Sequence, residues 1–222
     1  MARTMRRNTE IGNCSVLLGG IEPALSGMPR LYKHRINTIE ALAAVPLHMG
    51  IEFDLRSDGQ RVIVTHDPFT DGPTIEEFFP HIGQRPCIFN VKTEGIEERV
   101  MALAATHAIS EFFFLDLSVP AAVKLWRAGE RRIAVRYSEL EPAEGVLAWA
   151  DKASWVWVDC FTQFPPADAA WDIIASKFQV CLVSPELQRH SDEHAQALRA
   201  SLAGRTYHAV CTKTPDRWGP NP

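Results

Sequence analysis

The sequence predicts a single (β/α)8 barrel, a fold in which eight parallel strands are surrounded by helices. Short β-rich runs alternate with helical segments in eight successive units, each roughly 20–30 residues long. Alternating strands and helices favour a parallel sheet with helices outside it. The length of 222 residues, of which 46% are apolar, suits one domain of this class, since such barrels commonly have about 200–250 residues. A doubly wound sheet is less favoured because the cluster Leu18-Gly19-Gly20 lacks dinucleotide-binding glycine spacing.

The N-terminal segment, residues 1–29, does not follow this rhythm, and we expect it to cap one end of a barrel formed by residues 30–222. Its first residues are basic, as in a signal peptide. The apolar run that follows is short and contains glycines, so no signal peptide is predicted.

The first units are predicted from residue 30 onward. Residues 31–36 form a strand, and Asn37-Thr38 caps a helix over residues 39–49, whose apolar residues keep helical spacing. Residues 50–69 read as strand, turn and strand. Glu52 and Asp54 alternate with apolar residues, so both carboxylates share one face of the strand. Ser57-Asp58-Gly59 is typical of a turn, and residues 61–65 return as a short strand that leads to His66 and Asp67.

The remaining units continue the alternation to the end of the chain. Strands are predicted at residues 86–91, 112–117, 132–137, 155–160, 179–183 and 207–211. Helices are predicted between them at residues 96–107, 120–128, 142–150, 167–177 and 192–202.

Polar residues recur near the C-terminal ends of these strands, where barrel active sites are assembled. Burying such groups is costly unless they are paired, so the ring is either a satisfied network or a ligand site, and we favour a site. Its members are His34, Glu52, Asp54, Asn90, Lys92, Asp116, Arg136, Asp159, Ser184 and Lys213. Two roles stay open for Arg136 and Lys213: they bind phosphate, or they form ion pairs with Asp116 and Asp159.

The composition excludes several classes of partner. A net charge of −4 provides no basic field for nucleic acid. No run of about 18 apolar residues could span a membrane. The five cysteines are odd in number, four of them sit in apolar β-like runs, and no zinc-type spacing occurs. A reduced, cytoplasmic protein is predicted.

Three motifs together resemble the glycerophosphodiester phosphodiesterase superfamily, a group of barrel enzymes related to phosphoinositide phospholipase C. They are H-R-x-N-T at residues 34–38, E-x-D at residues 52–54 and H-D at residues 66–67. Each is weak alone, and the combination is specific. Asn90-Val91-Lys92 stands where the family places an acidic residue two positions before a lysine, and residues 212–216 loosely resemble the family's closing segment.

The resemblance implies a metal-dependent phosphoric diester hydrolase. His34 and His66 would be the general acid and base, and Glu52, Asp54 and Asn90 would hold a divalent cation, Mg²⁺ or Ca²⁺. The family also implies that Arg35 and Lys92 contact the phosphate. Other candidate residues are Arg136 and Lys213 at the phosphate, and Asp67, Asp116 and Asp159 as supporting carboxylates. The expected substrate is a small or glycan-linked phosphodiester.

The sequence departs from the family in three respects. Asn90 replaces an acidic ligand, which removes one negative charge and should weaken cation binding. Ile36 replaces a glycine, so the backbone there is less permissive. Only residues 68–85 separate His66-Asp67 from the next strand, where the family carries a longer insertion that shapes its substrate pocket. Glycerophosphodiester specificity therefore does not follow.

These departures keep other interpretations open. The chain could be a non-catalytic barrel that binds a phosphorylated ligand or a partner protein, or a lyase that releases a cyclic phosphate. Glu52 and Asp54 could instead form internal salt bridges with Arg56 or Lys92, and His34 could be a hydrogen-bonded strand-end histidine. Trp155 and Trp157 share one face of their strand and are expected to fill the core, although Trp157 lies near enough to the C-terminal end to wall a substrate.

Overall fold

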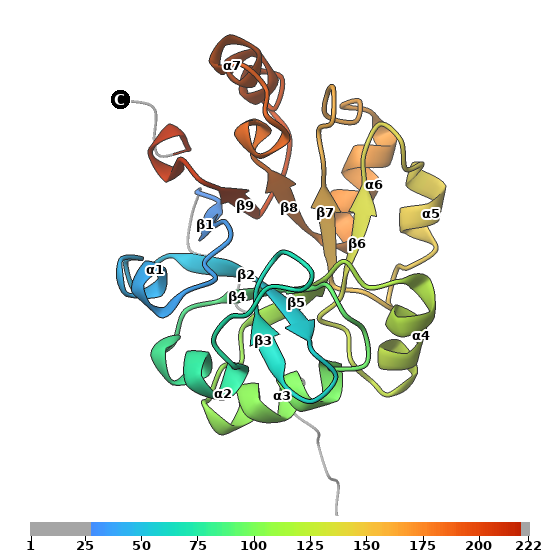
Figure 1. Ribbon diagram of the computed structural model, residues 1–222. Coiled ribbons are helices and arrows are strands. Elements are labelled where there is room, and N and C mark those ends of the chain that lie inside the picture. Colours follow the sequence, from blue (N-terminus) through green and yellow to red (C-terminus); the bar gives the residue numbers. More distant parts are fainter. Residues whose placement is uncertain (1–27, 219–222) are drawn as a thin grey trace, which may run out of the picture.

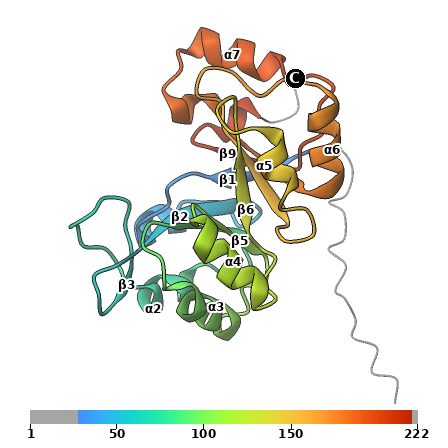
Figure 2. The same ribbon diagram turned by 90° about the vertical axis from the view of Figure 1, so that its right-hand side faces the viewer.

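The computed structural model describes residues 28–218, so nearly all of the predicted N-terminal cap lies outside the described residues. Eight parallel strands curl into a nearly closed barrel with helices around it (Figures 1 and 2), which confirms the predicted fold class. The barrel strands are β1 (Arg30–Lys33), β2 (Gly50–Ser57), β4 (Cys87–Val91), β5 (Phe112–Leu115), β6 (Ala134–Tyr137), β7 (Trp155–Val158), β8 (Gln179–Val183) and β9 (Ala209–Thr212).

The strand order is β5-β4-β2-β1-β9-β8-β7-β6, and β3 (Val62–Val64) pairs antiparallel with β2 as the predicted hairpin. Neighbours along this path are joined by parallel ladders. At the remaining seam, β5 and β6 are linked through the single isolated bridge between Phe114 and Ile133. The barrel is therefore weakest in hydrogen bonding at the β5–β6 seam.

Most of the predicted helices are shorter than the sequence pattern indicates, while α4 keeps the predicted length and begins one residue earlier. The described helices are α1 (Ile39–Ala43), α2 (Ile75–Phe78), α3 (Glu97–Thr106), α4 (Val119–Arg127), α5 (Ala143–Leu147), α6 (Ala169–Lys177) and α7 (Asp192–Ala200). Three 3₁₀ turns complete the described chain: η1 (Phe79–His81), η2 (Pro185–Gln188) and η3 (Pro215–Arg217).

The first helix begins where the sequence predicts and ends earlier than predicted. Thr38 caps α1 as predicted, because its hydroxyl accepts a hydrogen bond from the Ala41 N–H at 3.1 Å. The predicted extension of this helix to residue 49 is wrong, since it ends at Ala43 and Pro46, which has no N–H to donate, follows closely. The sequence pattern did not predict α2, which begins with a capping box between Thr74 and Glu77.

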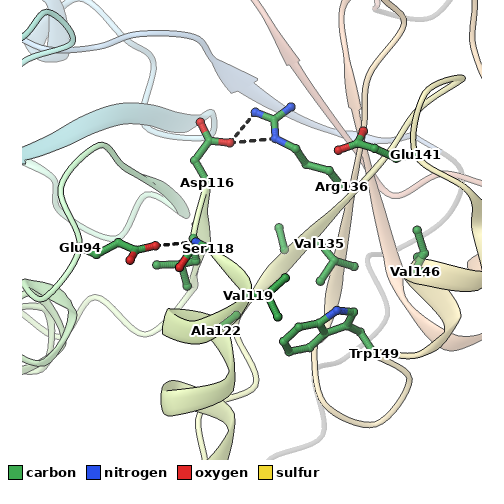
Figure 3. A pocket seen from close by; sticks show the side chains of 13 residues that line it. Glu94, Asp116, Ser118, Val119, Ala122, Val135, Arg136, Glu141, Val146 and Trp149 are labelled. Atoms are coloured by element: carbon green, nitrogen blue, oxygen red, sulfur yellow. Dashed lines mark hydrogen bonds and ion pairs between the residues drawn. The ribbon is translucent and has the colours of Figure 1, made fainter.

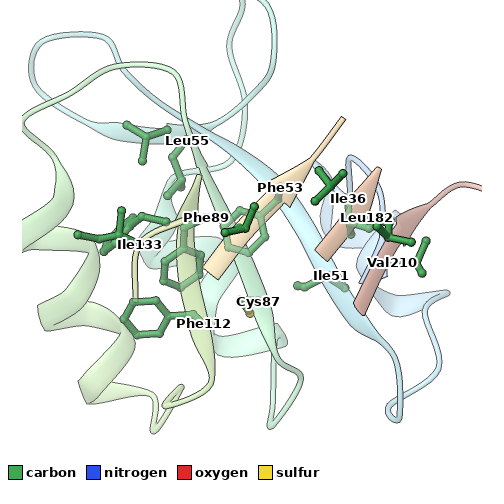
Figure 4. Packing of buried hydrophobic residues seen from close by; sticks show 14 of the residues in the cluster. Ile36, Ile51, Phe53, Leu55, Cys87, Phe89, Phe112, Ile133, Leu182 and Val210 are labelled. Atoms are coloured by element: carbon green, nitrogen blue, oxygen red, sulfur yellow. The ribbon is translucent and has the colours of Figure 1, made fainter. Parts of the chain in front are cut away.

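The period-two pattern of β2 separates its side chains between two environments. Ile51, Phe53 and Leu55 belong to the larger apolar cluster, which fills the space between the sheet and the helices (Figure 4). Glu52 and Asp54 point to the other face, into the barrel, and are both buried. The predicted sharing of one face by the two carboxylates is confirmed.

A second apolar cluster fills the barrel interior below these carboxylates. It contains Tyr32, Phe113, Trp155 and Trp157, and the rings of Phe113 and Trp155 stack with centroids 4.5 Å apart. Gly50 makes room for Tyr32, because a Cβ atom at this position would lie 2.4 Å from the tyrosine ring. The core-filling role expected for the two tryptophans is confirmed.

Two further findings bear on the composition-based expectations. Between residues 28 and 218, none of the helices is long and apolar enough to cross a membrane. The four cysteines in this part of the chain, Cys87, Cys160, Cys181 and Cys211, are buried and free of disulfide bonds.

Candidate active site

A cavity of about 550 Å³ opens at the C-terminal ends of the barrel strands. It gathers side chains from positions far apart in the sequence, as expected for this end of a barrel. All the predicted site residues line it except Glu52, which lies buried beneath, Asp67 and Ser184; the lining ones are His34, Arg35, Asp54, His66, Asn90, Lys92, Asp116, Arg136, Asp159 and Lys213.

Glu52 is the buried anchor of the site, with 1% of its surface exposed. Its Oε1 accepts a hydrogen bond from Asn90 Nδ2 at 2.9 Å, and its Oε2 accepts one from the Arg35 backbone N–H at 2.6 Å. His34 Nε2 lies 3.7 Å from Oε2. Burial, together with the negative charge of Asp54, raises the pKa of Glu52 to about 7.

The backbone at His34-Arg35-Ile36 is shaped by Arg35, which has a left-handed φ of 56°. This conformation turns the Arg35 N–H toward Glu52. The sequence placed the restriction at Ile36, the residue that replaces a glycine. Ile36 instead packs in the apolar core and donates its N–H to the Glu52 carbonyl at 2.8 Å. The strain is therefore carried one residue earlier than expected.

Asp54 is held by Asn37, for which the sequence predicted only a helix-capping role. Asn37 donates its Nδ2 to Asp54 Oδ2 at 2.8 Å, and its Oδ1 accepts the Asp54 backbone N–H at 3.0 Å. Lys92 Nζ lies 3.7 Å from Oδ1, and Arg35 Nε lies 3.9 Å from Oδ2. The signal for Asn37 was present in the H-R-x-N-T motif.

The predicted salt bridge alternatives for the carboxylate pair have different outcomes. Lys92 does approach Asp54, as one alternative proposed. Arg56 does not take part, because its Nε donates to the His66 carbonyl at 2.8 Å. This bond ties the loop after β3 to β2 and so positions His66 at the cavity.

A charged chain crosses the cavity on the side of β5, β6 and β7. Lys92 Nζ lies 2.7 Å from Asp116 Oδ2, and Arg136 Nε donates to Asp116 Oδ1 at 3.0 Å. The Arg136 guanidinium also pairs with Asp159, which accepts a further bond from Gln188 Nε2 at 2.7 Å. The ion-pair alternative for Arg136 is therefore realised, and phosphate binding by Arg136 stays a prediction.

The two carboxylates in this chain differ in protonation behaviour. Burial alone would raise the pKa of Asp116, yet the pKa lies below its usual range because Arg136 and Lys92 flank it. Asp159 is more deeply enclosed, with 1% of its surface exposed, and burial raises its pKa to about 6 despite Arg136.

The two candidate acid–base histidines are held differently. His34 is largely enclosed, and burial together with the charges of Arg35 and Lys213 lowers its pKa to about 3. Its Nδ1 is buried without a hydrogen-bond partner. His66 is partly exposed, and its Nδ1 lies 2.7 Å from Asp67 Oδ1, which lowers the pKa of Asp67. Asp67 thus contacts the His66 ring, and its supporting role there stays a prediction.

Lys213 lines the cavity just after β9, whereas Ser184, just after β8, is fully buried and does not line it. Lys213 has no carboxylate partner among the residues that the structure covers, so the ion pairs expected as an alternative do not form there. Ser184 is buried and bonded to Trp218 and Glu186, which gives it a structural role. The sequence pattern gave no signal for Gln188 and Arg189, which line the cavity from η2 and its end.

The residues at Glu52, Asp54 and Asn90 fit a divalent cation in one respect. Asn90 Oδ1 is buried without a hydrogen-bond partner, and an amide oxygen beside two carboxylates is a suitable donor for a hard cation. Over residues 28–218, no three His, Cys, Asp or Glu side chains come together as a metal-binding group. This follows from the amide at position 90, which leaves only two carboxylates.

Comparisons with solved structures agree with the barrel architecture. A glycerophosphodiester phosphodiesterase from Agrobacterium tumefaciens superposes with a TM-score of 0.63 at 16% identity, over 86% of this chain and 99% of the other. A glycerophosphoryl diester phosphodiesterase from Parabacteroides distasonis gives a TM-score of 0.59 at 12% identity, over 87% and 88% of the two chains. No family model and no curated protein matches the sequence. The chain therefore has the (β/α)8 barrel fold of the glycerophosphodiester phosphodiesterase structures.

Proposed function

We propose that this protein is a metal-dependent phosphoric diester hydrolase of the glycerophosphodiester phosphodiesterase type. The single observation that supports this most strongly is the meeting of His34 and His66 in one cavity with Arg35 and Lys92, above the Glu52–Asp54 pair. The fold shared with two phosphodiesterase structures adds support.

The cations of the cavity would bind the substrate. A phosphodiester carries one negative charge, which repels nucleophiles until neighbouring positive groups offset it. Arg35, Lys92 and Lys213 line the cavity, and Lys213 is the cation least committed to protein carboxylates among them. The bound anion would sit beside His34 and raise the low pKa of that imidazole.

The histidines would move the protons. The neutral His34 imidazole can accept a proton from the attacking hydroxyl, and His66, oriented by Asp67, can protonate the leaving oxygen. The geometry permits the reverse assignment as well. The nucleophile is water for hydrolysis, or a neighbouring hydroxyl of the substrate if a cyclic phosphate is released.

Glu52, Asp54 and Asn90 would hold the divalent cation through carboxylate and amide oxygens, and a bound cation would offset phosphate charge and orient a hydroxyl. Within the chain itself, Asn37 and the Arg35 N–H keep the two carboxylates aimed at this position. Weak binding of the cation is expected, because position 90 contributes no charge.

The test is hydrolysis of bis-p-nitrophenyl phosphate with Mg²⁺ or Ca²⁺. His34→Ala and His66→Ala should each lower kcat by at least about 100-fold. His48→Ala is the matched control, because His48 is exposed just before β2, at the opposite end of the barrel, and should leave the rate unchanged. Unchanged activity in both site variants would contradict the proposal. Phosphorus NMR of the products distinguishes hydrolysis from cyclic phosphate release.

A second candidate function is a non-catalytic barrel that binds a phosphorylated ligand. One observation favours it: Glu52 and Asp54 already have protein partners without a cation. These are hydrogen bonds from Asn90, the Arg35 backbone and Asn37, and the nearby charge of Lys92. This candidate predicts that phosphate esters bind in calorimetry while no product forms, with or without divalent ions.

A further inference from the structure

The β5–β6 seam carries a second cavity, of about 460 Å³, on the outer side of the barrel (Figure 3). Helices α4 and α5 flank it, and the two strands beneath are linked by a single bridge. The volume lies within the range of about 300–1,000 Å³ that is usual for ligand pockets. We call this cavity the seam groove.

The lining of the seam groove is mainly apolar. Side chains from both helices and from β6 face one another across it in Figure 3, namely Val119, Ala122, Val135, Val146 and Trp149. Val119 is 64% exposed at its edge. The groove thus offers apolar surface that residues 28–218 do not cover.

The charged groups of the seam groove are already bonded within the protein. Glu94 Oε1 accepts the Ser118 N–H at 2.6 Å, and Glu141 Oε2 accepts the Ser138 hydroxyl at 2.6 Å. Asp116 and Arg136 pair with each other (Figure 3). These charged groups are therefore committed to protein partners, and a charged or polar ligand would gain little from them.

The seam groove adjoins the candidate active site. Asp116, Arg136 and Glu141 line both cavities. The charges fix which end of a shared ligand lies where. Arg35 and Lys213 line only the cavity on the histidine side, whereas Glu94 lines only the groove and would repel an anion there.

We propose that the seam groove binds an unbranched alkyl chain carried by the substrate, so that the preferred substrates are phosphodiesters with one apolar substituent. This inference rests on the proposed function for the placement of the phosphate. The chain would pass the Asp116–Arg136 pair and lie between Val119 of α4 and Val146 of α5. Removal of its methylenes from water would supply the preference.

Gly145 of α5 provides a way to fill the groove without disturbing the fold. It lines the cavity, and a Cβ atom built there meets no atom within 4 Å. Gly145→Phe would therefore project a ring into open groove space, and Gly145→Ala is the matched control that adds a single methyl group. Val119→Glu is a second test variant, because its exposed position tolerates a charge.

Binding is measured by calorimetry with methyl phosphate and octyl phosphate, below the concentration at which octyl phosphate forms micelles. Each buried methylene strengthens binding by up to about fourfold. The parent protein and Gly145→Ala should bind octyl phosphate at least about tenfold more tightly than methyl phosphate. Gly145→Phe and Val119→Glu should reduce the ratio to below about threefold and leave methyl phosphate binding unchanged.

Hydrolysis of p-nitrophenyl methyl phosphate and p-nitrophenyl octyl phosphate provides the second readout. A higher kcat/KM for the octyl ester that Gly145→Phe abolishes supports the inference. Equal binding of the two alkyl phosphates by the parent, or a preference that both groove variants retain, overturns it. If neither ester is hydrolysed, the proposed function fails, and the binding ratio still decides whether the groove takes an alkyl chain.

Discussion

Asn37 makes two hydrogen bonds with Asp54: its Nδ2 donates to the carboxylate at 2.8 Å, and its Oδ1 accepts one from the Asp54 backbone N–H at 3.0 Å. The same residue lies next to Thr38, the cap of α1. The loop after β1 and the second strand are therefore locked in register at the point where the carboxylates enter the cavity. This arrangement makes Asn37 a positioning residue for the proposed cation site.

We predict that Asn37→Ala lowers phosphodiesterase activity by about 10–100-fold, the usual effect of removing a group that orients a metal ligand. Thermal or urea unfolding should also show a loss of about 1–3 kcal/mol, because the Asp54 N–H loses its acceptor. The apparent affinity for Mg²⁺ should fall in parallel with activity. Thr38→Ala, which removes only the helix cap, serves as the control and should leave Mg²⁺ affinity unchanged. Equal Mg²⁺ affinity in Asn37→Ala and the parent would contradict the positioning role.

The barrel could be predicted from the sequence because its information is local. Alternation of apolar and polar residues places Glu52 and Asp54 on the inner face, and the strand–helix rhythm brings the C-terminal strand ends together. Boundaries were less predictable. The strand predicted to reach residue 117 ends at Leu115, and Asp116 turns into a left-handed φ of 65°. This turn brings its carboxylate to Arg136 and Lys92, a long-range contact that strand propensity does not encode.

Other parts of the site depended on partner choices that arise only in three dimensions. Arg136 had two available carboxylates and pairs with both, while Lys213, predicted to have the same alternatives, pairs with neither. The four-residue helix α2 is too short to show a helical period, although its capping box is a local signal in the sequence. Phe78 packs on Phe53 of β2 with ring centroids 5.0 Å apart. The seam groove depends on how tightly β5 and β6 close, which no sequence period reports.

Position 90 offers a direct test of cation binding. Asn90→Asp adds a third carboxylate with almost no change in side-chain size, beside the orphaned position of Asn90 Oδ1. We predict at least a tenfold gain in Mg²⁺ or Ca²⁺ affinity by calorimetry, since ligand charge tunes affinity for hard cations. Without divalent ions the same variant should be less stable than the parent, because three carboxylates then repel one another.

The control for this prediction is Asn90→Ala, which removes the oxygen without adding charge. It should bind divalent ions no better than the parent. If Asn90→Asp also shows no gain in affinity and no stabilisation by Mg²⁺, the three positions do not form a cation site.

His208 should make stability depend on pH independently of the active site. The Val180 N–H donates to His208 Nδ1 at 2.9 Å, so the imidazole is held neutral, and burial lowers its pKa below the usual 6.5. The unfolded chain therefore binds a proton more readily than the folded one. The contribution is fully present above about pH 6.5 and is lost as the pH falls toward the lower folded pKa.

The measurement is urea unfolding of the parent and of His208→Asn between pH 7.5 and pH 5. Asparagine can present an acceptor oxygen to the Val180 N–H without titrating. The stability difference between the two proteins should shift in favour of His208→Asn as the pH falls. A constant difference across this range would show that His208 does not titrate on unfolding.

Arg136 links Asp116 and Asp159 where the candidate active site adjoins the seam groove, and its removal has a specific consequence. Arg136→Met leaves Asp159 buried with only the Gln188 bond, whereas Asp116 keeps Lys92. Breaking a buried ion pair by deleting one partner typically costs about 3–5 kcal/mol, and the partial exposure of Arg136 places the expected loss at the lower end. In the double variant Arg136→Met/Asp159→Asn the unpaired buried charge is absent and Gln188 still has an oxygen to bond, so most of the lost stability should be recovered.

The loss of stability in Arg136→Met should also be smaller at pH 5 than at pH 7. At pH 5 Asp159, whose pKa burial already raises to about 6, takes up a proton. Urea unfolding of the parent, both single variants and the double variant at the two pH values measures these terms. A single Arg136→Met variant as stable as the parent at pH 7 would show that the pair behaves as an exposed, screened contact.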